Sequence, residues 1–414
     1  MLSSFRYSRF RWLWFSNLAA SAGRWTLVLV LSVQLLQTTH SSFWVGLGLF
    51  LTQGPVIVLA PFSGALADRM DRRTLNVASC ITSGVVTAIF ALLSWTHTDL
   101  LAAWMGLALL FGLSFVAQMT VRATLTPNLV PAEGLLNATS LMQVSLQGAQ
   151  FAGPLVATPI LAAGGPAPAW AFCSVLYFVS AALCAPIGEV RGGGHRQNTG
   201  FGLVVAFRYL RSRGAAWVAV WAVALHCMLT MSYLGMLPMF VATDLGAGDS
   251  TYGALLASIG LGAVIGSLGL AQFARPRFQP LLFAYALVFS GVAISLLGVT
   301  TNIGFALVLG FLVGSSQAMF MSMTLAIIQS GVADEFRGRA TSFYQLITLT
   351  PMALFGWGMG GLADVTDPRP LMITLGIVFI IAMVVYGLSS TWLRGLFQPA
   401  GWLAVPATAE SPVL

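Results

Sequence analysis

Twelve apolar runs, separated by short polar segments, constrain this chain more than any other feature of its sequence. A transmembrane α-helix needs about 20 predominantly apolar residues, and each run is close to that length or longer. We therefore expect an all-α membrane protein with twelve transmembrane helices. The expected helices cover residues 12–37, 43–66, 74–95, 100–122, 136–163, 168–187, 215–242, 251–272, 280–300, 303–329, 341–364 and 370–393.

The composition supports this expectation. Hydrophobic residues make up 57% of the 414 residues and charged residues only 7%, whereas a soluble domain carries roughly 25% charged residues. No polar stretch is long enough to form a soluble catalytic domain, so we expect neither an enzyme nor nucleic-acid binding. The sequence contains no nucleotide-binding loop, zinc-protease motif or nucleophile elbow, and we expect no cofactor.

The four cysteines lie inside apolar runs and lack the CxxC spacing of metal sites and redox motifs. We expect them to pack as small apolar residues, without a disulfide or a metal. They are Cys80, Cys173, Cys184 and Cys227.

The basic residues are distributed unevenly along the chain. All nineteen are arginines, the formal net charge is +7, and seventeen arginines fall at the two ends of the chain, in its middle segment or in alternate loops. The other loops contain Arg369 as their single arginine, together with several aspartates. By the positive-inside rule we expect both termini in the cytoplasm and the protein in the cytoplasmic (inner) membrane.

The N-terminal segment fits two interpretations. Three arginines precede an apolar stretch and the triplet Ala20-Ser21-Ala22, as in a cleavable signal peptide. Apolar sequence resumes at Trp25 and continues to Leu36. We therefore favour an uncleaved first helix.

The chain divides into two similar halves. Residues 129–140 align without gaps to residues 331–342, at a constant offset of 202, with five of twelve positions identical. Parallel repeats of this kind place a substrate cavity between two six-helix bundles. The expected parts are an N-terminal bundle (1–187), a cytoplasmic linker with an amphipathic helix (188–214), a C-terminal bundle (215–393) and a cytoplasmic tail (394–414).

One motif identifies a family. Residues 64–73, which read GALADRMDRR, resemble motif A of the major facilitator superfamily, with Asp71 where glycine is usual. Their Asp-Arg-x-Asp-Arg-Arg form is similar to the branch that contains enterobactin exporters and macrolide efflux pumps. Other segments similar to that branch are Ser21-Ala-Gly23, Arg337-Gly-Arg339 and Gly361-Leu-Ala-Asp364.

This resemblance implies a gate at the cytoplasmic ends of the helices. Gly64 allows close helix approach, Asp68 faces a helix N-terminus, and the arginines pair with it. For Arg69 and Arg73 an equally good alternative is that they only enforce topology. The expected gating residues are Gly64, Asp68, Arg69, Arg72 and Arg73 in the first half, and Asp334, Glu335, Arg337 and Arg339 in the second.

Arg24 is the most informative single residue. Asn17, Ser21 and Arg24 follow i, i+4, i+7 spacing, and Arg24 falls near the middle of the membrane. A guanidinium there is costly unless it faces water or a partner. Members of the resembled branch commonly carry an acidic residue near this position, so Arg24 excludes a proton-carrying carboxylate and favours an anionic substrate. The alternative is a purely structural partner.

The fifth expected helix has a polar face and a flexible point. Gln147 and Gln150 are candidates for a neutral wall of the substrate cavity, although they could equally join packed helices. Gly153 and Pro154 resemble a degenerate antiporter motif, which implies export and a bend in this helix. Further candidate substrate contacts are Gln118, His226, Gln317 and Met321, for each of which ordinary packing is the alternative.

No Asp or Glu lies in the interior of an expected helix. Coupling to protons would therefore use His226, a carboxylate near a helix end (Asp68, Asp334, Glu335 or Asp364), or the charge of the substrate itself. The sequence does not choose among these.

The resemblance and the placement of Arg24 together imply a function. We expect a monomeric secondary transporter that exports an amphipathic, anionic, siderophore-like small molecule by alternating access. Its expected partners are this substrate, membrane lipids and coupling protons. The alternatives are a drug or macrolide efflux pump, a lipid flippase, and a non-transporting scaffold or sensor.

Overall fold

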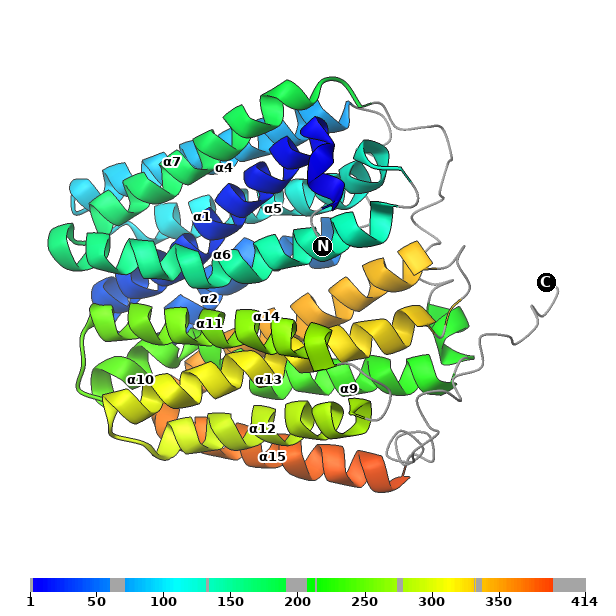
Figure 1. Ribbon diagram of the computed structural model, residues 1–414. Coiled ribbons are helices and arrows are strands. Elements are labelled where there is room, and N and C mark those ends of the chain that lie inside the picture. The colour runs from blue at the N-terminus through cyan, green and yellow to red at the C-terminus, as the bar shows by residue number, and fades with distance from the viewer. Residues whose placement is uncertain are drawn as a thin grey trace.

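A computed structural model describes residues 3–59, 71–131, 134–190, 207–212, 214–273, 278–330, 332 and 337–389. Every regular element formed by these residues is a helix, as expected from the sequence (Figure 1). Eleven helices in the described ranges are long and apolar enough to cross a membrane.

Six long or medium helices of the N-terminal half lie within the described residues. They are α1 (Ser8–Thr39), α2 (Ser42–Gln53), α4 (Arg72–Trp95), α5 (Leu101–Leu129), α6 (Leu135–Gly164) and α7 (Pro166–Cys184). Short 3₁₀ turns at Ser3–Arg6 (η1) and Ala185–Ile187 (η3) flank them.

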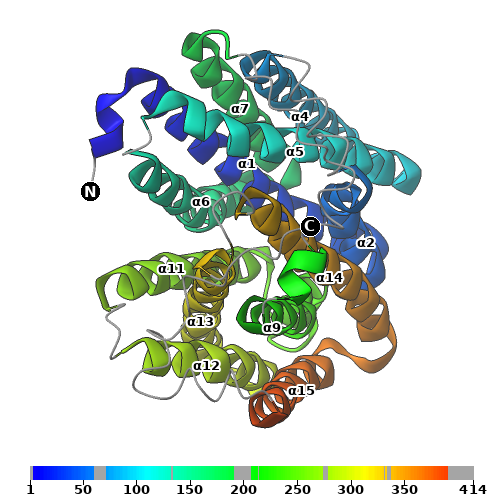
Figure 2. The same cartoon turned by 90° about the vertical axis from the view of Figure 1, so that its right-hand side faces the viewer.

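The C-terminal half begins with a broken helix. Its elements are α9 (Gly214–Thr230), η4 (Ser232–Gly235), α10 (Leu237–Thr243), α11 (Asp249–Phe273), α12 (Gln279–Val299), α13 (Ile303–Ser330), α14 (Arg337–Thr366) and α15 (Pro368–Ser389). In Figure 1 this half lies below the N-terminal half, and Figure 2 shows α2 next to α14 and α6 next to α11 between them.

The two ends of the helix bundle differ in charge. We call the end at which α1, α4 and α14 begin the arginine-rich end, because Arg6, Arg9, Arg11, Arg72, Arg73, Arg337 and Arg339 lie there. We call the opposite end, where α1 meets α2, the acidic end. Its aspartates are Asp99, Asp244, Asp249, Asp364 and Asp367.

The expected single helix over 215–242 is wrong. The chain leaves the α-helix after Thr230, passes through η4 and resumes as α10. Gly235 in the break lies against α14, because a Cβ there would lie 2.6 Å from the carbonyl oxygen of Gly356. Pro238 lacks an N–H for an α-helical hydrogen bond and favours a helix start, which is consistent with the beginning of α10 at Leu237.

Helix α6 corresponds to the expected transmembrane helix 136–163, but it is not one of the eleven helices that are apolar enough to cross a membrane. It has 30 residues and so is long enough. The amides of Gln143, Gln147 and Gln150 lower its hydropathy. It packs between the halves, against α1 and α11, where Gln147 and Gln150 are half-buried, whereas Gln143 is exposed.

The middle segment is described only in part. Residues 207–211 are helical, Leu210 is buried, and the ring of Phe207 packs edge-on against Trp217 with centroids 5.3 Å apart. The rest of the expected amphipathic helix and the expected tail lie outside the described residues. The division into parts at 187, 214 and 393 stays a prediction.

Glycines allow the two halves to touch backbone to backbone. A Cβ at Gly46 in α2 would lie 2.9 Å from the Cα of Trp357 in α14. A Cβ at Gly260 in α11 would lie 2.5 Å from the backbone nitrogen of Phe151 in α6. Neither distance is possible for a real side chain without movement of the neighbouring helix.

We expect Gly260→Ala to lower the melting temperature, because the added methyl group meets rigid backbone of α6. Overpacking of this kind costs about 1–3 kcal/mol. Gly269→Ala is the matched control, since it lies on the same helix with nothing within 4 Å of its Cβ position. Thermal unfolding of detergent-purified protein measures both, and equal melting temperatures for the two variants would contradict the inferred contact.

Candidate functional site

Arg24 lies where α1, α2 and α5 meet. Its Nη2 donates to Oε1 of Gln53 at 2.9 Å, and its guanidinium carbon lies 4.0 Å from the centroid of the Phe115 ring. Both partners are neutral, and no carboxylate pairs with Arg24 among the described residues. The positive charge is therefore held in place without being neutralised.

The local sequence of α2 explains the position of Gln53. The helix ends at Gln53, and Gly54 follows as its C-cap. Pro55 supplies no N–H to the preceding turn, so the helix is interrupted there. This interruption places the buried amide of Gln53 beside Arg24. The Gln-Gly-Pro triplet inside an apolar run is the sequence signal of this position, and it was not among the expected site residues.

A second arginine lies inside the N-terminal half. Arg122 of α5 donates to Oδ1 of Asn17 at 3.2 Å, Oδ1 of Asn76 at 3.3 Å, Sγ of Cys80 at 3.4 Å and Oγ of Ser180 at 3.5 Å. We call these five residues the Arg122 cluster. It joins α1, α4, α5 and α7 through neutral acceptors, so Arg122 acts as a cross-link within the half.

Two of the expected N-terminal candidates belong to such packing networks. Asn17 accepts from Arg122 and donates through Nδ2 to Oγ of Ser145 at 2.6 Å. Gln118 donates to the hydroxyl of Ser83 at 2.8 Å, within the same half. Ser21 is also buried. Within the described part of the chain, Arg24 makes no hydrogen bond to Asn17, Ser21 or Gln118.

In the C-terminal half, His226 and Gln317 are brought together. Thr230 lies between them: its hydroxyl is 3.0 Å from Nδ1 of His226, and its carbonyl accepts from Nε2 of Gln317 at 2.6 Å. His226 is fully buried and stacks on Phe320 at 4.4 Å between ring centroids. This arrangement favours a structural role for the imidazole.

Met321 forms a soft, polarizable contact surface. Its sulfur lies 3.7 Å from Sγ of Cys227, and the hydroxyl of Tyr344 lies 3.6 Å from the same sulfur. Met321 is half-buried, unlike Cys227 and Tyr344. All four cysteines of the chain are free and buried.

Helix α6 carries the remaining candidates at the boundary between the halves. Gln147 and Gln150 are half-buried, and the backbone of Gln150 meets Gly260 of α11. Gly153 allows close approach to α1, since a Cβ there would lie 2.7 Å from the carbonyl oxygen of Ala22. The helix continues through Pro154, and a bend at this residue stays a prediction.

The motif at the arginine-rich end is described only in part. Gly64, Asp68 and Arg69, and likewise Asp334 and Glu335, lie outside the described residues. Arg73 donates through Nε and Nη2 to the carbonyl of Ala185 at 3.1 and 2.7 Å. Arg72 is buried and donates to the carbonyl of Thr124 at 3.4 Å. Arg337 and Arg339 begin α14.

Asp71 is the N-cap of α4. Its Oδ2 accepts from the backbone N–H of Thr74 at 2.9 Å, and its Oδ1 accepts from the N–H of Val190 at 2.8 Å. Partial burial raises the pKa of this carboxyl, but the hydrogen bonds from Thr74 and Val190 outweigh it and lower the pKa below its ordinary value. An aspartate in place of the usual glycine thus gives this turn a helix cap.

Contacts across the halves at the acidic end involve two aspartates. Asp364, near the end of α14, accepts from the hydroxyl of Ser41 and from the backbone N–H groups of Ser42 and Phe43 at 2.5, 2.6 and 3.1 Å. Asp249 of α11 accepts from Nε2 of Gln37 in α1 at 2.7 Å. These hydrogen bonds join the two halves at the acidic end.

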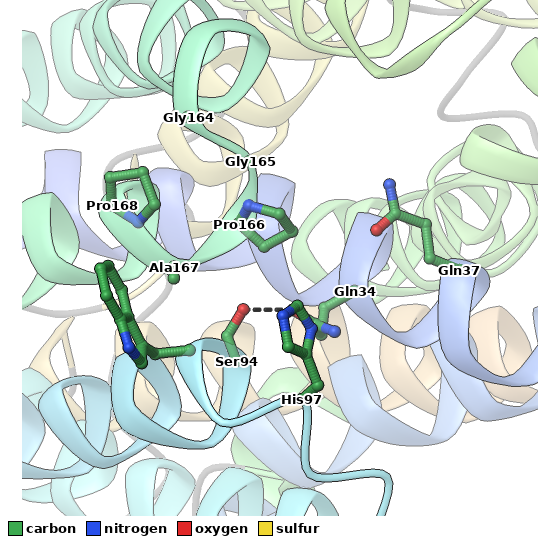
Figure 3. A pocket seen from close by; sticks show the side chains of 10 residues that line it. Gln34, Gln37, Ser94, His97, Gly164, Gly165, Pro166, Ala167 and Pro168 are labelled. Carbon is green, nitrogen blue, oxygen red and sulfur yellow. Dashed lines mark hydrogen bonds between the residues drawn. The ribbon is translucent and has the colours of Figure 1, made fainter.

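A pocket of about 500 Å³ lies beside these contacts (Figure 3). Gln34, Gln37, Ser94, His97 and the loop between α6 and α7 line it. The hydroxyl of Ser94 donates to Oε1 of Gln34 at 2.9 Å. The pocket is at the acidic end and does not include Arg24, so the Arg24 site is defined by its contacts and not by this hollow.

We expect Arg122→Gln to lower the melting temperature more than Arg24→Gln does. The first change removes four hydrogen bonds and strands buried polar partners, at a cost of about 2 kcal/mol or more. The second removes one hydrogen bond and one ring contact. Thermal unfolding of the two purified variants tests this order, and an equal or reversed order would show that the Arg122 cluster does not cross-link the half.

A pH dependence is expected for the α4 cap. Because the folded chain lowers the pKa of Asp71, its carboxylate stabilises the fold above the ordinary pKa, and this stability is lost as the pH falls through the folded value. Solvent screening limits the effect to on the order of 0.5 kcal/mol. Melting temperatures of wild type and Asp71→Asn should differ near neutral pH and converge in acid; a constant difference would contradict this.

Comparison with known proteins agrees with this architecture. The model of the Major Facilitator Superfamily matches residues 13–356. Enterobactin exporter EntS of Shigella boydii serotype 18 is 27% identical over 352 residues, which cover 81% of this chain and 80% of that protein. The Citrobacter koseri protein of the same name is 26% identical over 383 residues, covering 89% and 88%.

A crystal structure of a POT family transporter in complex with 5-aminolevulinic acid has the same fold, with a TM-score of 0.72 at 11% identity, covering 93% of this chain and 96% of that one. A second POT family transporter, in complex with a thioalcohol-conjugated peptide, has a TM-score of 0.70. The family match spans most of the chain. This multi-pass membrane protein belongs to the Major Facilitator Superfamily and is a transporter, not an enzyme.

Proposed function

We propose that the protein exports an amphipathic, anionic small molecule of the siderophore class across the cytoplasmic membrane, coupled to protons. The observation that carries this proposal is the environment of Arg24. Among the described residues, the guanidinium of Arg24 contacts the amide of Gln53 and the ring of Phe115, and it retains a charge that an anionic ligand would neutralise.

The relatives support the direction and the substrate class. Those named above are enterobactin exporters, and they are matched over most of their length. Arginine is also suited to such ligands, because its planar fork binds carboxylate and phenolate oxygens in a fixed geometry. The distribution of arginines supports an arginine-rich end in the cytoplasm and an acidic end outside.

Alternating access would then proceed between two rigid halves. The proposal assigns residues 1–187 and 215–393 to the moving bundles, with the linker and the tail in the cytoplasm. The contacts that join the halves at the acidic end support a state that faces the cytoplasm and receives substrate from that side. Gln147 and Gln150 of α6, at the boundary between the halves, would complete a neutral wall.

Drug efflux is the second candidate. It is favoured by the half-buried side chain of Met321, which packs on the buried Cys227 and Tyr344 and is flexible and polarizable enough to suit varied lipophiles. This reading predicts ligands that are neutral or cationic and whose binding does not depend on Arg24.

We expect a catecholate siderophore to raise the melting temperature of the wild type, because a ligand that binds the folded state stabilises it by mass action. Arg24→Gln should weaken this binding about tenfold or more, since it removes a charge-assisted contact. Arg208→Gln is the matched control, because it makes the same charge change at an exposed arginine. Hydroxamate and carboxylate siderophores, macrolides and lysolipids complete the panel.

The outcomes separate the candidates. Stabilisation by macrolides that is unchanged in Arg24→Gln supports drug efflux, and stabilisation by lysolipids supports lipid translocation. Siderophore stabilisation that persists in Arg24→Gln removes Arg24 from the site. Gradient-dependent flux in proteoliposomes then tests transport, and its absence with every ligand of the panel would overturn export in favour of a scaffold or sensor.

A further inference from the structure

The N-terminus of α2 is capped by the other half of the molecule. Ser41, its N-cap residue, makes no side-chain hydrogen bond to its own helix. Instead, the carboxylate of Asp364 on α14 accepts from the N–H groups of Ser42 and Phe43 and from the hydroxyl of Ser41. The first N–H groups of a helix need a partner, and here the partner comes from across the boundary between the halves.

The cap contributes more than one ordinary hydrogen bond. A carboxylate at a helix N-terminus also interacts favourably with the positive end of the helix dipole. Gly360 on α14 lies against Ser42, so the two backbones are in contact next to the cap. The spacing Gly360-x-x-x-Asp364 is the same as that of Gly64-x-x-x-Asp68 at the arginine-rich end.

Among the described residues, Asp364 is hydrogen-bonded to the N-terminus of α2, and the charged groups nearby are engaged elsewhere or exposed. Helices α2 and η4 contain no charged residue in their described ranges. At the beginning of α15, Asp367 is exposed, and Arg369 is engaged by Asp244 at 3.0 Å. His40, one residue before Ser41, is a titratable group adjacent in the chain to the N-cap of α2. Asp249 has its own partner, Gln37.

We propose that Asp364 and the N-terminus of α2 form a proton-sensitive latch that holds the acidic end of the transporter closed. The inference rests on the proposed function for its cycle, in which this end opens outside the cell. Protonation of Asp364 removes the negative charge that three donors share. The closed state thereby loses its cap, and the equilibrium shifts toward separation of α2 from α14.

The position of Asp364 defines what the latch does. The side chain is exposed at the acidic end, and the pocket of Figure 3 opens at the same end. Protons therefore bind to Asp364 from the solution at the acidic end and are released to the same solution. The latch is a gate that responds to external acidity, and the proton that drives transport is carried by another group.

The test measures the separation of the halves without substrate. Thr96 in the α4–α5 loop and Thr301 in the α12–α13 loop are exposed positions at the acidic end, one in each half. Each is replaced by cysteine and spin-labelled; the four native cysteines are buried and should not react. Pulsed electron paramagnetic resonance in lipid nanodiscs then gives the distance distribution at near-neutral pH and at acidic pH.

We expect a short distance near neutral pH and a growing long-distance population in acid for the wild type. Asp364→Asn should raise the ratio of open to closed molecules about tenfold near neutral pH and remove most of its pH dependence, because it abolishes charge-assisted hydrogen bonds. Asp367→Asn, an equal charge change three residues away, should behave as wild type. His40→Gln should retain the acid response.

Several outcomes would overturn the latch. They are an unchanged distance in Asp364→Asn near neutral pH, an acid response that survives in Asp364→Asn, and an acid response that His40→Gln abolishes. Wild type without any acid response also overturns it, even if no variant folds. The measurement involves no substrate, so a wrong substrate class leaves this result intact, whereas siderophore binding without an acid response rejects the latch alone.

Discussion

Hydrocarbon supplies no hydrogen-bond partners, so a polar side chain carried into the bundle is costly unless it finds a partner within the chain. The Arg122 cluster meets this requirement by gathering acceptors from three neighbouring helices around one guanidinium. The helices α1, α4, α5 and α7 are thereby fixed relative to one another as one body. Arg24 has one hydrogen bond, to an amide, and one ring contact among the described residues. Arg122 has four hydrogen bonds, and this difference in the number of partners distinguishes a structural arginine from a candidate ligand-binding one.

Much of the fold could be predicted because apolar length and arginine-rich loops are local properties of the sequence. The position of Arg24 inside α1 followed from the same reasoning. The role of Arg122 did not, because its partners Asn17, Asn76 and Ser180 come from helices far apart in the chain. Arg122 is the last residue of the expected helix 100–122, whereas in the structure it lies within a buried network.

For other features, the sequence contains the relevant residues but does not predict the structure that they form. Gly235 and Pro238 mark the break between α9 and α10, yet the unbroken apolarity of that region outweighed them. Gln118 and His226 carry polar groups into the membrane, as a substrate site would, but each is engaged by its own half. A polar residue in an apolar segment can be either a structural hydrogen-bonding residue or a ligand contact. The two roles are distinguished only by the residues that surround it in the folded structure.

The cap on α2 also links local helix order to global conformation. The amide hydrogens of Ser42 and Phe43 are bonded to Asp364 and not to carbonyl groups of their own helix. Their exchange with solvent deuterium therefore depends on contact between the halves, whereas exchange deeper in α2 depends on unfolding of the helix itself. Deuterium exchange at two backbone amides in the first turn of α2, measured by mass spectrometry, therefore reports whether the two halves are in contact at the acidic end.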